Sequence, residues 1–386
     1  MYERLLRARL ERFEQKSVLV LGPRQVGKST LLRSLGPQLA IDLSSPDVYR
    51  RYVGHPERLE KELRAVTAGR QTVLIDEVQR VPALLDMVQA LVDESPDRYR
   101  FLLSGSSARK LRRGQANLLP GRVLVYAMHP LLQVEIGSMF ELDRALGHGT
   151  LPGIYGESDP ELRNELLRSY ADTYLREEIQ AEGIVRDVGG FSRLFDYVAA
   201  ASGRILNINA LSQDAGISYV TARRYMEILE DTLVLWRIPA WSGSDRGKLV
   251  AHPKVILFDL GVRNALLRRP LDKPLPDERG LLLEQFVGLE ILCRTGSLWP
   301  DARLHHFRTR AGLEVDYLLE VGREVWGIEV KASSSVGRAD FRGLNALDTH
   351  VRTLKRRIVV FLGDRAQAYD GVEVLPLAEF LSLLPA

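Results

Sequence analysis

The stretch S-V-L-V-L-G-P-R-Q-V-G-K-S-T, residues 17–30, decides the fold of the first part of the chain. An apolar run of strand-forming residues leads into Gly22, and the residues from Gly22 to Ser29 match the pattern G-x-x-x-x-G-K-[ST]. In a strand–turn–helix context, such a glycine-rich turn directs successive backbone N–H groups at phosphate oxygens. The sequence therefore predicts a phosphate-binding loop between a strand and a helix.

Each position of this loop has an expected role in binding ATP with Mg²⁺. Gly22 and Gly27 allow backbone conformations that turn N–H groups inward, and a helix beginning near Lys28 adds partial positive charge. We expect the Lys28 side chain to reach the β- and γ-phosphates and the Ser29 hydroxyl to ligate Mg²⁺. Only nine of the 53 basic residues are lysines, so a lysine at the motif position is informative. The predicted nucleotide-binding residues are Gly22, Pro23, Arg24, Gln25, Val26, Gly27, Lys28, Ser29 and Thr30.

Four more apolar runs follow in the first third of the chain, at residues 39–43, 72–77, 100–105 and 122–127. The segments between them have the length and periodicity of helices, and residues 83–92 are an example. Apolar strands that alternate with helices predict an α/β fold with a parallel sheet covered on both faces.

Polar residues end two of these runs. Asp76 and Glu77 follow the apolar run 73–75. An acid at this edge can hold the Mg²⁺ shell and its neighbour can orient or deprotonate water, although Asp76 could instead cap the next helix. Ser104 ends the next run, and we expect it to face the γ-phosphate if its strand is inserted between the other two. Ser106 and Ser107 are close alternatives for that position.

Several arginines after Ser107 are candidates for an arginine finger. They are Arg109, Arg112, Arg113 and Arg122. We favour Arg122 because it opens a strand directly after a Pro-Gly pair, while a solvated surface position is an equal alternative.

The composition narrows the class of protein. The 386 residues are enough for two or three domains with hydrophobic cores, and 45% hydrophobic against 27% charged residues is typical of a globular protein. Lys+Arg 53 against Asp+Glu 50 gives a net charge of +3, so any nucleic-acid site must be a local patch. Cys293 has no second cysteine to pair with, no run of eighteen apolar residues occurs, and the N-terminus is highly charged. We expect a cytoplasmic protein without a membrane span.

The chain is expected to divide into three parts, at residues 1–148, 149–265 and 266–386. A glycine-containing stretch at 147–153 is the predicted linker after the first part. Residues 161–180 are predicted to form an amphipathic helix, with Leu162, Leu166, Tyr170 and Tyr174 on one face.

Residues 207–230 predict a helix–turn–helix. The first helix is short, Ser218 is a suitable N-cap, and the second helix spans residues 219–230. Two strands follow at 233–241 and 255–259, joined by a polar loop, which is typical of a winged helix. DNA is the candidate partner of this segment, through Arg223, Arg224, Arg246 and Lys248. The alternative is packing against the first domain or a neighbouring subunit, since acidic residues accompany these arginines.

The last third contains a candidate metal site. Residues 313–319 and 324–330 predict a β-hairpin that carries Asp316 and the sequence Glu329-Val330-Lys331. Because strand side chains alternate, Glu329 and Lys331 share a face. In an Asp…Glu-x-Lys array, two carboxylates ligate Mg²⁺ and the lysine positions or activates water, as in PD-(D/E)xK nucleases. Glu284, from a preceding helix, could complete the metal site. The alternative is a degenerate fold used for binding or assembly.

Taken in order, these motifs resemble bacterial and archaeal AAA-type ATPases related to the STAND group, whose members commonly carry a C-terminal domain of uncharacterised function. The likeness continues through residues 150–155, 170–179, 253–261 and 314–317 and covers nearly the whole chain. Glu178 departs from it, because an aspartate is expected there. The resemblance implies a P-loop ATPase domain, a winged-helix region and a C-terminal α/β domain similar to restriction endonucleases.

Two hypotheses remain open for the function. In the first, ATP hydrolysis drives a nucleic-acid-associated activity of the C-terminal domain, which could include cleavage. In the second, ATP controls a switch or assembly scaffold whose endonuclease-like domain is inactive and binds a protein partner. Both require ATP at Lys28, and a homo-oligomer is compatible with either.

Overall fold

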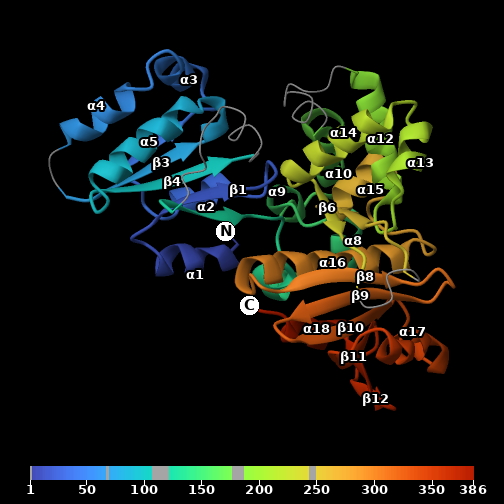
Figure 1. Cartoon of the computed structure of the whole chain (residues 1–386). Coiled ribbons are helices and arrows are strands. Elements are labelled where there is room, and N and C mark those ends of the chain that lie inside the picture. Colours follow the sequence, from blue (N-terminus) through green and yellow to red (C-terminus); the bar gives the residue numbers. More distant parts are fainter. Residues whose placement is uncertain (1, 67–68, 107–120, 176–186, 243–248) are drawn as a thin grey trace. The chain divides into compact units, whose positions relative to one another are not determined.

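The computed structural model describes residues 2–66, 69–106, 121–175, 187–242 and 249–386 (Figure 1). These residues form two compact units. The N-terminal unit comprises Met1–Leu131 and Ile228–Val234, and the C-terminal unit comprises Leu132–Glu227 and Leu235–Ala386. Over the described ranges, no helix combines the length and the apolar character needed to cross a membrane.

A five-stranded parallel sheet forms the centre of the N-terminal unit. Its strands are β1 (Ser17–Leu21), β2 (Leu39–Asp42), β3 (Gln71–Asp76), β4 (Tyr99–Gly105) and β5 (Val123–Ala127). Their order is β2-β3-β4-β1-β5, and every neighbouring pair is parallel. The predicted α/β fold with a parallel sheet is confirmed. Because β4 lies between β1 and β3, Ser104 is on the inserted strand that its predicted role requires.

Helices cover this sheet and form its hydrophobic core. They are α1 (Leu5–Arg12), α2 (Lys28–Arg33), α3 (Pro46–Val53), α4 (Arg58–Ala65), η1 (Val78–Arg80) and α5 (Ala83–Glu94). Tyr52, Leu59 and Val88, from three of these helices, share one buried cluster with strand residues such as Val73 and Phe101. All residues of β1 and β4 are buried, as expected for central strands with both faces covered.

The C-terminal unit begins with a helical region. Its elements are α7 (Gln133–Ile136), η2 (Gly137–Met139), α8 (Leu142–His148), α9 (Pro152–Tyr155), α10 (Pro160–Ser169), η3 (Tyr170–Leu175), α12 (Val188–Ala201), α13 (Ile208–Asp214), α14 (Tyr219–Asp231), β6 (Leu235–Ile238), β7 (Lys254–Leu257) and α15 (Leu260–Leu266). The last residues of α14 are counted with the N-terminal unit.

Much of the predicted linker, residues 147–153, is packed against the rest of the C-terminal unit. Gly147 and His148 end α8, and both are buried. A Cβ atom at Gly147 would lie 2.0 Å from the backbone oxygen of Leu271. Glycine is required here because two backbone segments approach closely, so the composition that suggested flexibility reflects tight packing.

The amphipathic helix expected over residues 161–180 is interrupted, and its buried face differs in part from the prediction, although Tyr170 is buried as expected. α10 ends at Ser169 and passes into the π-helical turn η3. Leu162 and Leu166 are 46% and 42% exposed, whereas Arg163 and Leu167 are buried. Arg163 turns inward because its guanidinium donates to the Glu157 carbonyl at 3.0 and 2.8 Å, a partner that hydrophobic periodicity cannot predict. The Tyr174 side chain lies outside the described residues.

The predicted helix–turn–helix is confirmed by α13 and α14. The Thr221 N–H donates to the Ser218 hydroxyl at 3.1 Å, so Ser218 caps the second helix as expected. β6 and β7 pair in antiparallel fashion. Their connection is held at both arms, since Ala240 and Leu249 form bridges to residues of β8 (Arg303–Arg308) and to the adjoining Thr309. The base of the predicted wing is therefore part of the C-terminal sheet region, and its tip at 243–248, with Arg246 and Lys248, lies outside the described residues.

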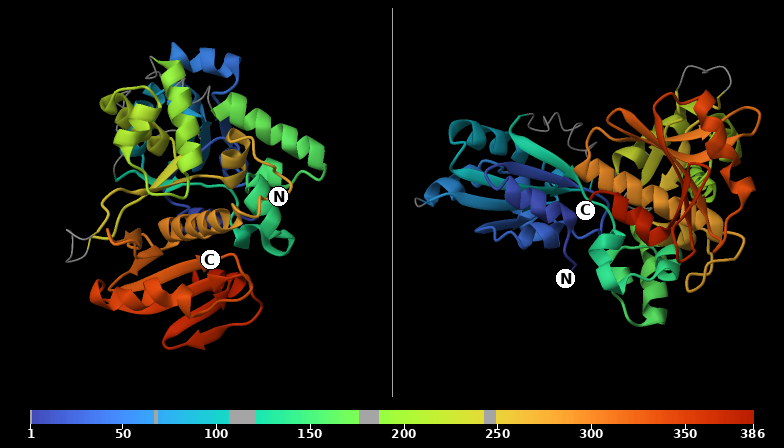
Figure 2. Two further views of the ribbon diagram at one scale, coloured as in Figure 1. Left: turned by 90° about the vertical axis from the view of Figure 1, so that its right-hand side faces the viewer. Right: turned by 90° about the horizontal axis from the view of Figure 1, so that it is seen from below.

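A six-stranded mixed sheet completes the C-terminal unit. It contains β8, β9 (Glu314–Val321), β10 (Glu324–Lys331), β11 (Leu354–Phe361), β12 (Gln367–Tyr369) and β13 (Val372–Pro376), in the order β12-β13-β11-β10-β9-β8. The predicted β9–β10 hairpin is present. The accompanying helices are α16 (Arg279–Leu298), η5 (Arg338–Phe341), α17 (Arg342–Ala346), η6 (Leu347–Thr349) and α18 (Leu377–Leu383). The long helix α16 runs along the sheet (Figure 2).

Candidate functional site

The glycine-rich loop connects β1 to α2 and presents its backbone amides. Gln25 and Gly27 have positive φ angles of 62° and 95°. The N–H groups of Gln25, Val26 and Gly27 have no acceptor among the residues that the structure describes. Consecutive N–H groups in such a conformation form a concave anion-binding surface, and phosphate oxygens supply the acceptors that they lack. The loop therefore fits a nucleotide phosphate.

The two glycines of the motif are required for different structural reasons. Gly27 needs its positive φ, as expected. At Gly22 the φ angle is not positive, and the constraint is instead a close approach, because a Cβ atom there would lie 2.2 Å from the Met128 backbone oxygen. The segment after β5 is thus packed directly against the start of the loop.

Lys28 is the first residue of α2 and is 5% exposed. Its ammonium donates to the backbone oxygens of Gly22 and Pro23, both at 2.8 Å. These bonds keep the positive charge over the loop. Ser29 and Thr30 follow on the first turn of the same helix.

The structure brings Asp76, Glu77 and Ser104 together beside the loop. The Ser104 hydroxyl donates to the Asp76 carboxylate and accepts from the Glu77 N–H at 3.0 Å. β4 joins this cluster to the loop, since the Gly22 N–H donates to the Gly105 carbonyl at 3.2 Å. Glu77 has a φ of 59°, an uncommon conformation for a non-glycine residue that often marks a functional position. A buried carboxylate, a second carboxylate and a hydroxyl in this arrangement can hold a hydrated divalent cation and accept a proton from water.

Sequence reasoning missed Gln79, which holds Glu77. The Gln79 amide nitrogen donates to the Glu77 carboxylate at 2.5 Å and to the Ser106 hydroxyl at 2.9 Å, and the side chain is buried. Ser106, an alternative to Ser104, therefore contacts Gln79, and Ser107 lies outside the described residues. The signal was the stretch D-E-V-Q, in which a glutamine follows two acids on a short helical turn.

The candidate arginine finger Arg122 forms an ion pair with Asp93 on α5, with Nε 2.5 Å from Oδ1. The hydrogen bond from Arg122 lowers the pKa of the Asp93 carboxyl. The finger role stays a prediction, and the other three candidates at positions 109, 112 and 113 lie outside the described residues.

In the C-terminal unit, Asp316 on β9 and Glu329 on β10 lie beside the register pair Tyr317–Ile328. The Val330 N–H donates to Asp316 Oδ2 at 2.8 Å, and the Lys331 ammonium lies 2.8 Å from Glu329 Oε1. Burial, followed by the charge of Asp316, raises the pKa of Glu329 to about 7. Over the described ranges, Glu329 Oε2 is a buried oxygen without a hydrogen-bond partner.

Glu284 takes a different position from the one expected of a third metal ligand. The Lys254 ammonium lies 2.5 Å from Glu284 Oε1 and also donates to the Asp316 backbone oxygen at 3.3 Å. Burial and the charge of Asp316 raise the pKa of Glu284 to about 8. Sequence reasoning missed Lys254, although a rare lysine opening the apolar strand β7 was a visible signal.

These contacts limit the metal chemistry of the C-terminal cluster. Within the part of the chain that the structure describes, no group of three or more His, Cys, Asp or Glu side chains could hold a metal ion. Lys254 supplies the positive charge at Glu284, so the expected three-carboxylate set is not assembled. Asp316 and Glu329, with the partnerless Oε2 atom, fit a smaller two-carboxylate site of the kind that Mg²⁺ uses.

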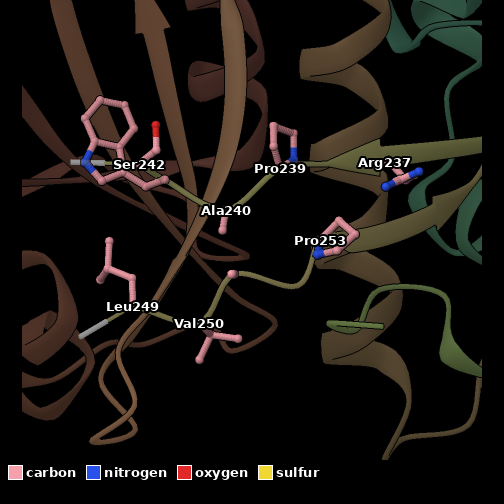
Figure 3. A pocket seen from close by; sticks show the side chains of 9 residues that line it. Arg237, Pro239, Ala240, Ser242, Leu249, Val250 and Pro253 are labelled. Carbon is pink, nitrogen blue, oxygen red and sulfur yellow. The ribbon is translucent and has the colours of Figure 1, made fainter. Parts of the chain in front are cut away.

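Two further surfaces of the C-terminal unit lie apart from these clusters. A cavity of about 560 Å³ is lined by Arg237, residues 239–242, residues 249–251 and Pro253, and Figure 3 shows side chains such as Pro239, Leu249 and Val250 around it. Among the residues that the structure describes, no predicted site residue lines it. On α14, Arg223 and Arg224 are exposed, and Arg223 pairs with Glu227 at 3.3 Å.

Comparison with known protein families agrees with the geometry of the N-terminal unit. Residues 14–137 match a family model described as an AAA domain. Together with the parallel sheet and the glycine-rich loop, this match supports an AAA-type P-loop ATPase fold for the N-terminal part. Residues 139–273 and 279–380 match two models described as domains of unknown function, DUF8612 and DUF4143.

Relatives that this chain matches over most of their length exist in bacteria. Uncharacterized proteins of Mycobacterium tuberculosis and Mycobacterium bovis are each 28% identical to this chain over 392 residues, covering 97% of the chain and 83% of the relative. An uncharacterized protein of Haemophilus influenzae is 24% identical over 80% of the chain and 76% of its own length.

Two solved structures illustrate how distant the structural matches are. A RuvB variant from Thermotoga maritima is 16% identical, covers 61% of this chain and 86% of its own, and has a TM-score of 0.29. Protein VC1899 from Vibrio cholerae is 14% identical, covers 95% and 96%, and has a TM-score of 0.22. Scores this low carry no functional argument.

Proposed function

We propose that this protein binds ATP with Mg²⁺ at residues 22–30 and hydrolyses it. The observation that carries the proposal is the Ser104 hydroxyl, which joins the Asp76 carboxylate to the Glu77 backbone beside the loop. The AAA domain match over residues 14–137 supports it. Nucleotide-bound Mg²⁺ neutralises phosphate charge.

The proposed roles of the residues follow from their positions. The loop amides and Lys28 bind the phosphates, and Ser29 and Asp76 hold the cation. The Glu77 carboxylate takes a proton from the attacking water, and Gln79 orients that carboxylate. The Ser104 hydroxyl holds the Asp76 carboxylate and the Glu77 backbone in fixed positions relative to each other. Arg122, or an arginine of a second copy in a homo-oligomer, would stabilise the negative charge of the transition state. If the arginine comes from a second copy, hydrolysis would depend on protein concentration.

Nucleotide binding and turnover should be separable by two substitutions. Lys28→Ala is expected to abolish ATP binding, whereas Glu77→Gln retains binding and loses turnover by roughly 10²–10⁴-fold. Lys61→Ala, at an exposed position of α4, is the matched control. Binding is measured by calorimetry with a non-hydrolysable analogue, and turnover by phosphate release. Full turnover by Glu77→Gln would remove Glu77 from the mechanism, and unchanged binding by Lys28→Ala would contradict the site.

We propose as a second function that the C-terminal unit acts on nucleic acid, with DNA as the partner and a Mg²⁺ ion held by Asp316 and Glu329. The specific support is the partnerless buried Glu329 Oε2 beside Asp316 and Lys331. Exposed Arg223 and Arg224 on α14, with Arg246 and Lys248 of the predicted wing, would contact phosphates. In a cleaving site, Lys331 would position the water.

The nuclease and scaffold hypotheses predict different results when DNA cleavage and ATP turnover are measured in the same preparation. Mg²⁺-dependent cleavage of DNA that disappears in Lys331→Ala supports a nuclease. ATP turnover without cleavage of DNA or RNA supports the alternative, a nucleotide-dependent switch or scaffold that binds a protein. The three-part division at residues 148 and 265 remains part of this proposal, and limited proteolysis with mass spectrometry tests it.

A further inference from the structure

Arg4 connects the N-terminus of the chain to the phosphate-binding loop. It directly precedes α1, and its side chain is buried, with the residue 9% exposed. The guanidinium donates to the Val26 backbone oxygen at 3.0 Å, to the His129 oxygen at 2.5 Å and to the Pro130 oxygen at 3.4 Å. One side chain therefore binds the middle of the loop and the segment that follows β5.

The segment after β5 supports the loop from a second direction. The Met128 N–H donates to the Leu21 carbonyl at 2.7 Å, at the end of β1. The Met128 oxygen closes the space above Gly22, and the Met128 methyl group would lie 3.7 Å from a Cβ atom at Gly27. Met128 thus packs against the loop, and Arg4 ties the loop and the segment after β5 to α1.

The position of Arg4 is itself fixed by the packing of α1. Leu6 and Leu10 are buried, and Leu10 is fully so. The Arg100 guanidinium, on β4, donates to the Leu10 carbonyl at 2.8 Å. Because α1 is held on the sheet, the Arg4 guanidinium has little freedom to leave the three carbonyls.

We propose that Arg4 is a positioning residue of the nucleotide site. By holding the Val26 carbonyl, Arg4 fixes the peptide groups whose N–H groups would face the phosphates. Nucleotide binding then does not have to meet the entropy cost of ordering the loop. Arg4 also ties the loop to residues 129 and 130, just before the N-terminal unit ends at Leu131. This inference rests on the proposed binding of ATP, and it assigns a role to a residue outside the loop motif.

The test compares Arg4→Met with Arg4→Lys and with the control Arg7→Met in the full chain. Arg7 is on α1 with its side chain 40% exposed and paired to Glu11. We expect Arg4→Met to weaken binding of a non-hydrolysable ATP analogue about tenfold and to raise KM similarly, because charged hydrogen bonds are lost. The kcat at saturating ATP should stay within about twofold, since Arg4 does not touch the reacting atoms. Arg4→Lys should recover part of the affinity, and Arg7→Met should match wild type.

Hydrogen exchange at Gly22 and Leu31, whose N–H groups donate to the Gly105 and Gly27 carbonyls at 3.2 and 3.0 Å, gives a readout without nucleotide that does not depend on ATP. Faster exchange there in Arg4→Met, with a melting temperature close to that of Arg7→Met, supports the inference. Affinity and exchange equal to those of Arg7→Met overturn it. Wild type that binds no ATP analogue would overturn the proposed function, while the exchange comparison would still decide the role of Arg4. If Arg4→Met does not fold, Arg4→Lys provides the same comparison.

Discussion

The Lys254 ammonium lies 2.5 Å from the Glu284 carboxylate, and both groups are largely buried in the C-terminal unit. Each charge needs the other, because an isolated ion in such surroundings loses its hydration without compensation. This pair explains why Glu284 does not join Asp316 and Glu329 as a free third ligand.

Removing one member of this pair should destabilise the fold strongly. We expect Lys254→Met to lower the free energy of unfolding by about 3–5 kcal/mol above pH ~8, where Glu284 is ionised and its charge is left uncompensated, and by less near neutral pH. The double variant Lys254→Met/Glu284→Gln should recover much of that loss. Urea unfolding measures both, with Lys61→Met as the exposed control. Equal stability of wild type and the single variant would show that the pair contributes nothing.

Metal binding should depend on Asp316 and Glu329 but not on Glu284. In a Lys28→Ala background without nucleotide, calorimetric titration with Mg²⁺ or Mn²⁺ should show binding that Asp316→Asn abolishes. Glu284→Gln should keep the metal affinity within about threefold of the parent, because Lys254 already engages that carboxylate. Equal losses in the two variants would place Glu284 among the ligands.

Gln79 should affect turnover and leave nucleotide affinity unchanged. Gln79→Ala removes the amide that holds the Glu77 carboxylate, so we expect kcat to fall about tenfold or more while analogue binding stays unchanged. Gln213→Ala, at an exposed position on α13, is the matched control. Loss of affinity together with kcat would indicate a general disturbance of the site.

Asp259 should make stability depend on pH. Its carboxylate is buried and accepts from the N–H groups of Thr150 at 2.7 Å and Val262 at 3.0 Å. Burial outweighs these bonds and raises its pKa from 3.8 to about 6. The folded pKa lies above the unfolded one, so the stabilisation is complete below pH ~4 and is lost as pH rises through about 6.

Over the whole titration, from well below pH ~4 to above pH ~7, the loss corresponds to about 3 kcal/mol. Asp259→Asn should remove this part of the pH dependence, although it lowers stability overall because an amide offers only one acceptor oxygen. Urea unfolding at pH 4.5 to 7.5 gives the slope of the free energy of unfolding against pH for wild type and for Asp259→Asn. Identical slopes in wild type and variant would contradict the assignment.

Local patterns in the sequence predicted most elements of the N-terminal unit and the helix–turn–helix. The five strands, the loop before Lys28 and the cap at Ser218 depend on residues close in the chain, so periodicity and turn chemistry identify them. Periodicity failed at α10, where Arg163 is buried in place of Leu162 and Leu166. A buried arginine depends on carbonyls that a distant or irregular segment supplies.

The sequence by itself determined the phosphate-binding loop, the parallel sheet that presents it and the types of side chain at each strand end. Only the tertiary structure decided which distant groups meet: Arg4 with Val26, Gln79 with Ser106, and Lys254 with Glu284. The physical reason is that backbone propensities act over a few residues, whereas a buried polar group is satisfied by whichever partner the packed elements bring within hydrogen-bond distance.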